Sequence, residues 1–250
     1  MHFDKTRRQL HEGGVLAMIA NVRSYKKNQV SQAEVITAIG RFHDDYKIKH
    51  VTAALDEIED YTGDVWFVDG DLHIPGDLDL TQEGVYLLVV LGDLVVDGAY
   101  GDSDDPESFL LVTGNMRARD VVTAGWLEVH GDLSTDRLIG DYNDCSAYIG
   151  GDVHARLFYG EEHHFTIGGA LSADAVIGRP RLEIATPPAV IGMDDLRILE
   201  HFDRALLRVF DDHDNNGNAI TYVDGFRDFR ELKRRVNAGL PLRAAETRDN

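Results

Sequence analysis

The residues whose spacing best matches a metal site lie in the run Asp212-His213-Asp214-Asn215-Asn216-Gly217-Asn218. This run matches the first half of an EF-hand loop, in which oxygen ligands at alternate positions bind Ca²⁺ and a glycine makes the sharp turn. The twelfth position, where an EF-hand has a bidentate Glu, is Val223. The sequence therefore predicts either a weak calcium site and no other cofactor, or a polar interhelical turn. The candidate ligands are Asp212, Asp214, Asn216, Asn218 and Asp224.

Histidines beside acids are the other residues that could do chemistry. His163-His164 follows Glu161-Glu162, and such groups can bind a metal ion or transfer protons. No HxxxH, cysteine-rich or GxSxG pattern accompanies them, and the single cysteine, Cys145, allows no intrachain disulfide. The sequence favours a protein without enzymatic activity. A metal-dependent enzyme that uses this acidic, histidine-containing edge is an alternative.

The elements that must position these residues come from an internal repeat. Glycine anchors recur 16, 22, 17, 20 and 18 residues apart, and the positions two and four residues before and after each anchor are mostly apolar. Period-two alternation on both sides of a glycine corner predicts strands, and a repeat of this length predicts one coil of a β-solenoid per anchor. The anchors are Gly76, Gly92, Gly114, Gly131, Gly151 and Gly169.

We therefore expect a mainly β protein with a single parallel β-solenoid (β-helix) of about six to seven coils over residues 63–192. The position five residues after the anchors alternates in charge from coil to coil. Its residues are Asp97, Arg119, Asp136, Arg156 and Asp174. Because neighbouring coils lie about 4.8 Å apart, we expect Arg119 and Arg156 each to lie between carboxylates of adjacent coils. The Asp or Asn directly after most anchors is expected to accept a backbone N–H at its corner.

The segments on either side of the solenoid have helical patterns. Ser31-Gln32-Ala33-Glu34 has the form of a capping box, and Leu196 to Val209 has apolar residues at helical spacing. We expect a helical N-terminal cap over 1–62, a helical C-terminal cap over 193–243 and a tail over 244–250. Such caps would cover the strand edges at the ends of the coil, so we expect a monomer or a small closed oligomer.

Negative charge is concentrated in the repeat. Residues 63–192 contain 23 Asp and Glu but six Arg and no Lys, so this segment accounts for −17 of the net charge of −19. Such a surface repels nucleic acid and anionic membranes, and it attracts basic proteins or cations. The alternative is that the charge serves solubility alone. The first residues are charged and contain no long apolar segment, so we expect a cytoplasmic protein.

Extra residues enter the longer coils at one corner, after a recurring glycine, and we expect these insertions to form a binding edge. The candidate residues for contact with a partner are Asp102, Asp104, Asp105, Glu107, Asp141, Asp144, Glu161, Glu162, His163 and His164. A second candidate surface is the outward apolar patch that includes Phe109, Trp126 and Tyr148. Either a terminal helix such as Leu196 to Phe210 covers this patch, or it is a protein interface, to a second copy or to another chain.

Runs such as Leu91-Gly92-Asp93-Leu94-Val95-Val96 and Ile149-Gly150-Gly151-Asp152-Val153-His154 resemble the repeats of bacterial polymer-forming cytoskeletal proteins, the bactofilins. They are similar also to bacterial Gly-Asp-Leu solenoid proteins of toxin–immunity loci. The first resemblance implies self-assembly, but helical caps and coils of unequal length depart from it. The second implies an immunity or antitoxin-like protein that neutralises a basic toxin by occlusion. We take the second as the expected function, and a self-assembling structural protein as the alternative.

Overall fold

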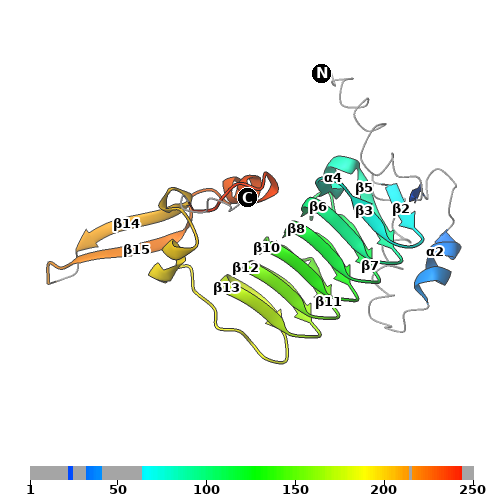
Figure 1. Ribbon diagram of the computed structural model, residues 1–250. Helices are drawn as coiled ribbons and strands as arrows, with labels where there is room; N and C mark the ends of the chain where they lie inside the picture. Colours follow the sequence, from blue (N-terminus) through cyan, green and yellow to red (C-terminus); the bar gives the residue numbers. More distant parts are fainter. Residues whose placement is uncertain (1–21, 25–31, 41–63, 214–215, 244–250) are drawn as a thin grey trace, which may run out of the picture.

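The computed structural model describes residues 22–24, 32–40, 64–213 and 216–243. Most of the expected N-terminal cap and the 244–250 tail therefore lie outside the described residues. Within them the chain is mainly β, and its coils stack into one elongated parallel solenoid (Figure 1). The predicted fold class is confirmed.

Each coil contributes strands to two sides of a 13-stranded sheet. The strands before the corners are β2 (Asp64–Val68), β5 (Val85–Val90), β7 (Phe109–Val112), β9 (Trp126–Val129) and β11 (Ser146–Ile149). Those after the corners are β3 (Leu72–Ile74), β4 (Leu78–Asp79), β6 (Leu94–Gly101), β8 (Met116–Thr123) and β10 (Leu133–Gly140). The long strands β12 (Val153–Ile167) and β13 (Leu171–Glu183) take part in both sides, and β1 (Val22–Ser24) pairs antiparallel with β2.

The apolar columns predicted from the repeat form the core. Leu94, Met116, Leu133 and Val153 are paired side by side in consecutive coils and are buried. The first coil is different from the prediction, because Leu72 pairs with Leu94, whereas the repeat placed it beside Leu88. The corner of the first coil is therefore at Gly70-Asp71. Gly76-Asp77 forms the next corner of the same coil, where the carbonyl of Gly76 accepts the backbone N–H of Gly98 in the following coil.

The acidic residues after the glycines form a ladder that joins the coils. The Oδ1 atom of Asp71 accepts the backbone N–H of Asp93 at 2.8 Å, and Asp93 in turn accepts the N–H of Asn115 at 2.7 Å. The same bond recurs up to Asp152, which accepts from Ala170 at 2.7 Å. The expected structural role is confirmed, with the donor in the next coil. The successive steps of this ladder are 22, 22, 17, 20 and 18 residues.

The alternating charged column stacks as predicted, and within the described residues its members form no ion pairs with one another. Asp136 lies beside Arg119 and Arg156 in the strand register. The Arg119 side chain contacts Asp120, with Nε 2.6 Å from Oδ2, and its Nη2 lies 3.8 Å from Oδ1 of Asp77. Arg156 makes no ion pair within the described part of the chain. The predicted placement of the arginines between carboxylates is confirmed by the register, but no ion pair forms within the column, because Arg119 contacts a buried carboxylate and a pair on the open face would stay hydrated and gain little.

Helix α2 (Gln32–Ile39) covers the outward apolar patch from the side. Val35, Ala38 and Ile39 pack against β2, β5 and β7, where Phe109 is 4% exposed. Figure 1 shows α2 beside these strands. The expectation that a helix covers the patch is confirmed, but the covering helix is N-terminal and not the 196–210 stretch. The short helix α4 (Leu80–Glu83) lies at the first coil.

The C-terminal segment forms a lobe of mixed structure. The expected long helix over 196–209 is wrong: this stretch forms the 3₁₀ turns η3 (Leu196–Glu200) and η4 (Arg204–Leu206), followed by strand β14 (Leu207–His213). Strand β15 (Ala219–Phe226) pairs antiparallel with β14, and helix α5 (Phe229–Asn237) follows. Asp195, Asp203 and Asp228 cap η3, η4 and α5 by accepting backbone N–H groups, which explains why these acids begin the turns.

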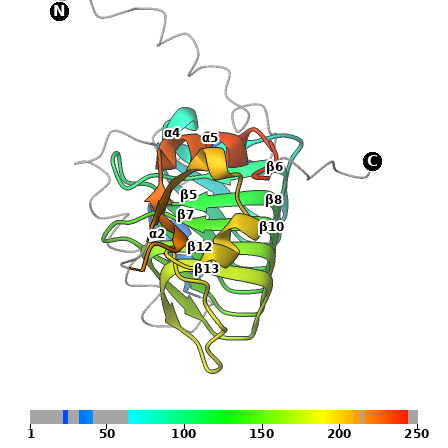
Figure 2. The ribbon, with the colours of Figure 1, turned by 90° about the vertical axis from the view of Figure 1, so that its left-hand side faces the viewer.

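This lobe packs along one side of the solenoid, next to α4, while the β14–β15 hairpin projects away from the coils (Figures 1 and 2). Four outward apolar residues, one per coil, pack against Phe202, Leu232 and other residues of the lobe. They are Val122, Ile139, Tyr159 and Ile177. Helix α2 and the C-terminal lobe therefore cover sides of the solenoid, whereas the sequence predicted helical caps over its ends. In the described residues the end strands β2 and β13 are instead paired with β1 and with Ile191. Within the described residues no helix is long and apolar enough to cross a membrane.

Candidate functional site

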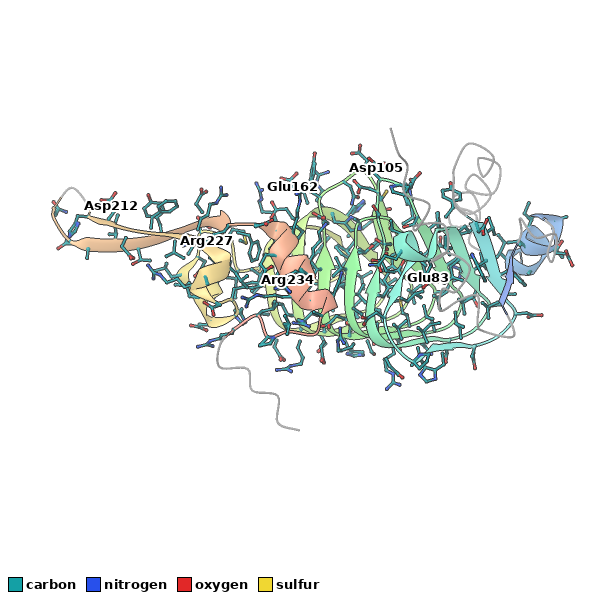
Figure 3. The ribbon with its side chains drawn as sticks, turned by 90° about the horizontal axis from the view of Figure 1, so that it is seen from above. Glu83, Asp105, Glu162, Asp212, Arg227 and Arg234 are labelled. Atoms are coloured by element: carbon teal, nitrogen blue, oxygen red, sulfur yellow. The ribbon has the colours of Figure 1, made fainter. Side chains whose placement is uncertain are left out.

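The insertions of three coils meet at one corner, which we call the loop edge (residues 101–108, 141–145 and 160–164). Cys145 Sγ lies 3.8 Å from Glu107 Oε1, and His163 Nδ1 lies 3.2 Å from Asn143 Oδ1. Figure 3 shows Asp105 and Glu162 along the same edge of the solenoid. The predicted convergence of the insertions is confirmed, and the contacts between them make the loop edge one continuous surface.

Asp102, a predicted contact residue, faces into the protein. Its carboxylate accepts the hydroxyls of Tyr100 and Thr123, both at 2.9 Å, and the backbone N–H groups of Ala124 at 2.5 Å and Gly125 at 2.7 Å. Burial raises the pKa of Asp102, and these four hydrogen bonds oppose that rise. Burial, followed by the Asp102 charge, raises the pKa of Tyr100. Asp102 therefore shapes the corner and is not free to contact a partner.

Glu107 and Asp141 also have internal partners. Glu107 accepts the indole N–H of Trp126, and Asp141 Oδ2 lies 2.6 Å from Nζ of Lys233 in α5. Burial, and then the charge of Glu107, raises the pKa of Cys145 to about 12, so this thiol is protonated and weakly nucleophilic at neutral pH. These acids attach the insertions to the solenoid and to the C-terminal lobe.

Glu161 and Glu162 are neutralised by arginines of the last coil. Glu161 contacts Arg179 and the hydroxyl of Tyr159, while Glu162 Oε2 lies 2.9 Å from Arg181 Nη2. Glu162 has a left-handed backbone with φ of 58°, as expected at a tight corner. His164 points outward with half of its side chain exposed, 3.9 Å from Glu183.

His163 points inward. Its residue is fully buried, its ring packs edge-on against Phe165 with centroids 5.0 Å apart, and Nε2 has no hydrogen-bond partner. Burial lowers the pKa of His163 to about 4, with a smaller contribution from His164, while the Asp141 backbone and Asp104 oppose the shift. The imidazole is therefore neutral near pH 7, and His163 was wrongly predicted to meet a partner.

Acid should destabilise the loop edge through His163. Its pKa is near 6.5 in the unfolded chain and about 4 in the folded protein, so the unfolded state binds the proton first as the pH falls. The stability present above pH 6.5 is lost progressively down to about pH 4, by up to roughly 3 kcal/mol. We expect His163→Gln to lose less stability than the wild type between pH 7 and 4.5, measured by urea unfolding. The exposed His154→Gln should match the wild type, and equal losses in all three proteins would contradict the assignment.

The exposed residues that remain at the loop edge are few. Asp104, Asp105 and Asp144 are exposed, and Tyr142 between the acids is 61% exposed. At the second candidate surface, Phe109 is buried and stacks on Trp126 with centroids 6.1 Å apart, while Trp126 and Tyr148 are half-buried. The loop edge therefore offers three carboxylates, the exposed imidazole of His164 and one aromatic ring, and the apolar patch offers little.

The predicted calcium ligands lie on the hairpin, between two strands where the sequence predicted two helices. Asp212 pairs with Ile220 near the tip, whereas Asp224 lies next to Val223, which pairs with Val209 towards the base (Figure 3). Asp224 also lies 3.7 Å from Arg208 Nη2. Asp214 is outside the described residues, Asn216 and Asn218 lie at the tip, and the described residues contain no group of three His, Cys, Asp or Glu suited to a metal ion. The hairpin register thus separates Asp224 from Asp212.

Sequence reasoning missed a buried ionic cluster under the lobe. Arg137 binds Asp120 through two hydrogen bonds of 2.5 and 2.8 Å, and the Asp120 side chain is completely buried. Arg137 and Arg119 also donate to the backbone carbonyls of Leu240, at 2.7 Å, and Asn237, at 2.8 Å. The available signal was a charged residue directly before an apolar pair in two consecutive coils, Asp120 before Val121-Val122 and Arg137 before Leu138-Ile139.

No family model, curated protein or solved structure matches the chain.

Proposed function

We propose that this protein is a non-enzymatic binding protein whose loop edge engages a basic protein partner. The observation that carries the proposal is the convergence of three insertions on one corner, joined by the Glu107–Cys145 and Asn143–His163 contacts. Loops held in this way lose little conformational entropy on binding, which favours affinity. Neutralisation of a basic toxin in the cytoplasm by occlusion is the specific form that we propose.

Exposed acids define the contact surface within the loop edge. Asp104, Asp105 and Asp144 are exposed on a segment with a charge of −17, so a cationic surface is attracted over the whole solenoid and meets these carboxylates first. Tyr142 adds an exposed ring of the kind that anchors protein interfaces. The surrounding acids that bind Arg179, Arg181 and Lys233 keep the loops in place.

Charge removal at the loop edge should slow association. The variant Asp104→Asn/Asp105→Asn/Asp144→Asn is expected to associate about tenfold more slowly with its basic partner near 50 mM salt, and the difference should shrink near 300 mM as screening increases. The partner is first captured from a lysate on the wild-type protein and identified, and rates are then measured by surface plasmon resonance.

The matched control is Asp174→Asn/Asp194→Asn/Glu200→Gln, which removes the same charge from exposed positions outside the loop edge. This control should keep most of the wild-type rate. If both triple variants slow association equally, the steering is due to net charge alone and the loop edge is not the recognition surface.

One observation favours self-assembly as a second candidate. Strand β13 pairs with β12 on one side, while on its other side Ile191 bridges Ile177 and leaves much of the described edge uncovered. Leu171 and Leu182 of β13 are only partly buried. A further strand could pair with this edge. Filaments seen by electron microscopy of the purified protein would support this alternative, whereas a monomer or small closed oligomer would support the binding protein.

A further inference from the structure

A groove of about 530 Å³ crosses the strands that follow the corners, from β6 to β13. Its lining includes outward ionisable side chains from consecutive coils: Asp97, Arg117, Arg119, Asp136, His154 and Arg156. Its volume is in the range of small-molecule sites. It shares no residue with the loop edge.

Two arginines of this groove have no ion-pair partner among the residues that the structure describes. Of the six arginines in residues 63–192, Arg119 and Arg137 bind Asp120, and Arg179 and Arg181 bind Glu161 and Glu162. Arg117 and Arg156 are exposed, and neither forms an ion pair with any residue that the structure describes. In a segment with so many acids, two guanidinium groups that face one groove without ion pairs indicate an anionic ligand.

A third guanidinium in the groove is already fixed in place. Arg119 is held by Asp120 and by the carbonyl of Asn237, and it packs closely beneath Gly239. Its position is therefore set before any ligand arrives, which lowers the entropic cost of binding. In the strand register Arg117, Ser134, His154 and Ser172 form one row across consecutive coils, so two hydroxyls and an imidazole continue the row that Arg117 begins.

We propose that this groove binds a small polyanion, whose carboxylate or phosphate oxygens accept hydrogen bonds from Arg117 and Arg156. These residues lie on strands two steps apart, so their backbones are roughly 10 Å apart along the solenoid. Long arginine side chains can span that distance to one compact ligand with several anionic groups. The planar guanidinium fork matches both carboxylate and phosphate oxygens. Asp136, between the two arginines, disfavours a single small anion and favours a ligand that also donates a hydrogen bond.

Citrate and inorganic triphosphate are the probes that test this groove, each titrated into the full chain by calorimetry at low salt. We expect saturable binding of at least one probe, and the stronger probe identifies the source as a carboxylate or a phosphate. Arg117→Gln/Arg156→Gln should weaken that binding by about tenfold or more, because each change removes a charge-assisted hydrogen-bond donor. Backbone amide signals of Ser134 and His154 should shift in the NMR spectrum of the wild type on titration.

The matched control is Arg179→Gln/Arg181→Gln, which removes the same charge from β13, where both arginines contact acids of the loop edge. It should bind the probe within about twofold of the wild type if short-range hydrogen bonds dominate. Equal weakening in both double variants, or no saturable binding of either probe to the wild type, overturns the proposal. An unfolding midpoint equal to that of the wild type confirms that the groove variant is folded.

Discussion

Replacing Gly131 with Ala is expected to lower the free energy of unfolding by about 3 kcal/mol, whereas the same change at Gly76 should alter it by less than about 0.5 kcal/mol. A Cβ atom at Gly131 would lie 2.7 Å from the carbonyl oxygen of Gly114 in the preceding coil and would also overlap Oδ1 of Asn115. The Asn115 side chain could move, but the Gly114 carbonyl is backbone, so only a shift of whole coils can relieve that overlap. Such a shift would lengthen the ladder bond from Asp132 to Asn115, which is 2.9 Å.

Gly76 is the matched control for this experiment. It belongs to the same repeat but lies in the first coil, and a Cβ atom there would have no neighbour within 4 Å. Urea unfolding followed by circular dichroism would give both values. If Gly131→Ala is as stable as the wild type, the coils are not in close contact at their glycine corners.

Asp120→Ala should destabilise the protein by about 3 to 5 kcal/mol, because it leaves the Arg137 guanidinium buried without its carboxylate. Asp120 accepts hydrogen bonds from both Arg137 and Arg119, and these two arginines donate to carbonyls at and beyond the end of α5. Cationic groups at a helix C-terminus also stabilise its dipole. Loss of Asp120 is therefore expected to loosen the C-terminal lobe before the coils unfold.

Limited proteolysis and urea unfolding together test this order of events. In Asp120→Ala, cleavage around residues 193–243 should become faster than in the wild type while the solenoid stays resistant. The control is Asp97→Ala, whose ion pair with His73 is about half exposed and whose loss should have little effect. Equal protease resistance of Asp120→Ala and the wild type would show that the cluster does not hold the lobe.

The coil architecture was predictable because its physics is local and repeated. Each coil has an apolar residue two positions after its glycine, and stacking of the coils buries these residues in one column. They are Leu94, Met116, Leu133 and Val153. The first coil was misplaced by one corner because Gly70-Asp71 and Gly76-Asp77 match the same pattern, and only the pairing of Leu72 with Leu94 distinguishes them. The convergence of the insertions was predictable for the same reason, since they enter at equivalent positions.

Side-chain directions at the loop edge were not predictable. Asp102 and Asp104 are two residues apart in one acidic insertion, yet the first accepts four internal hydrogen bonds and the second is exposed. His163 and His164 are neighbours, but one faces inward and the other outward. Which member of such a pair faces solvent depends on backbone donors from the next coil, and these come from residues about 20 positions away.

By itself, the sequence determined the parallel solenoid, its glycine corners, the inward columns and the acidic charge, because each follows from a periodic pattern in consecutive coils. The tertiary structure decided what covers the sides of the solenoid. Helix α2 covers the apolar patch that the 196–210 stretch was expected to cover. That stretch instead forms turns and a strand, and it packs beside Val122, Ile139 and Tyr159. It also decided that Arg119 pairs with Asp120, since a buried carboxylate beneath the lobe binds a guanidinium more strongly than a hydrated one on an open face.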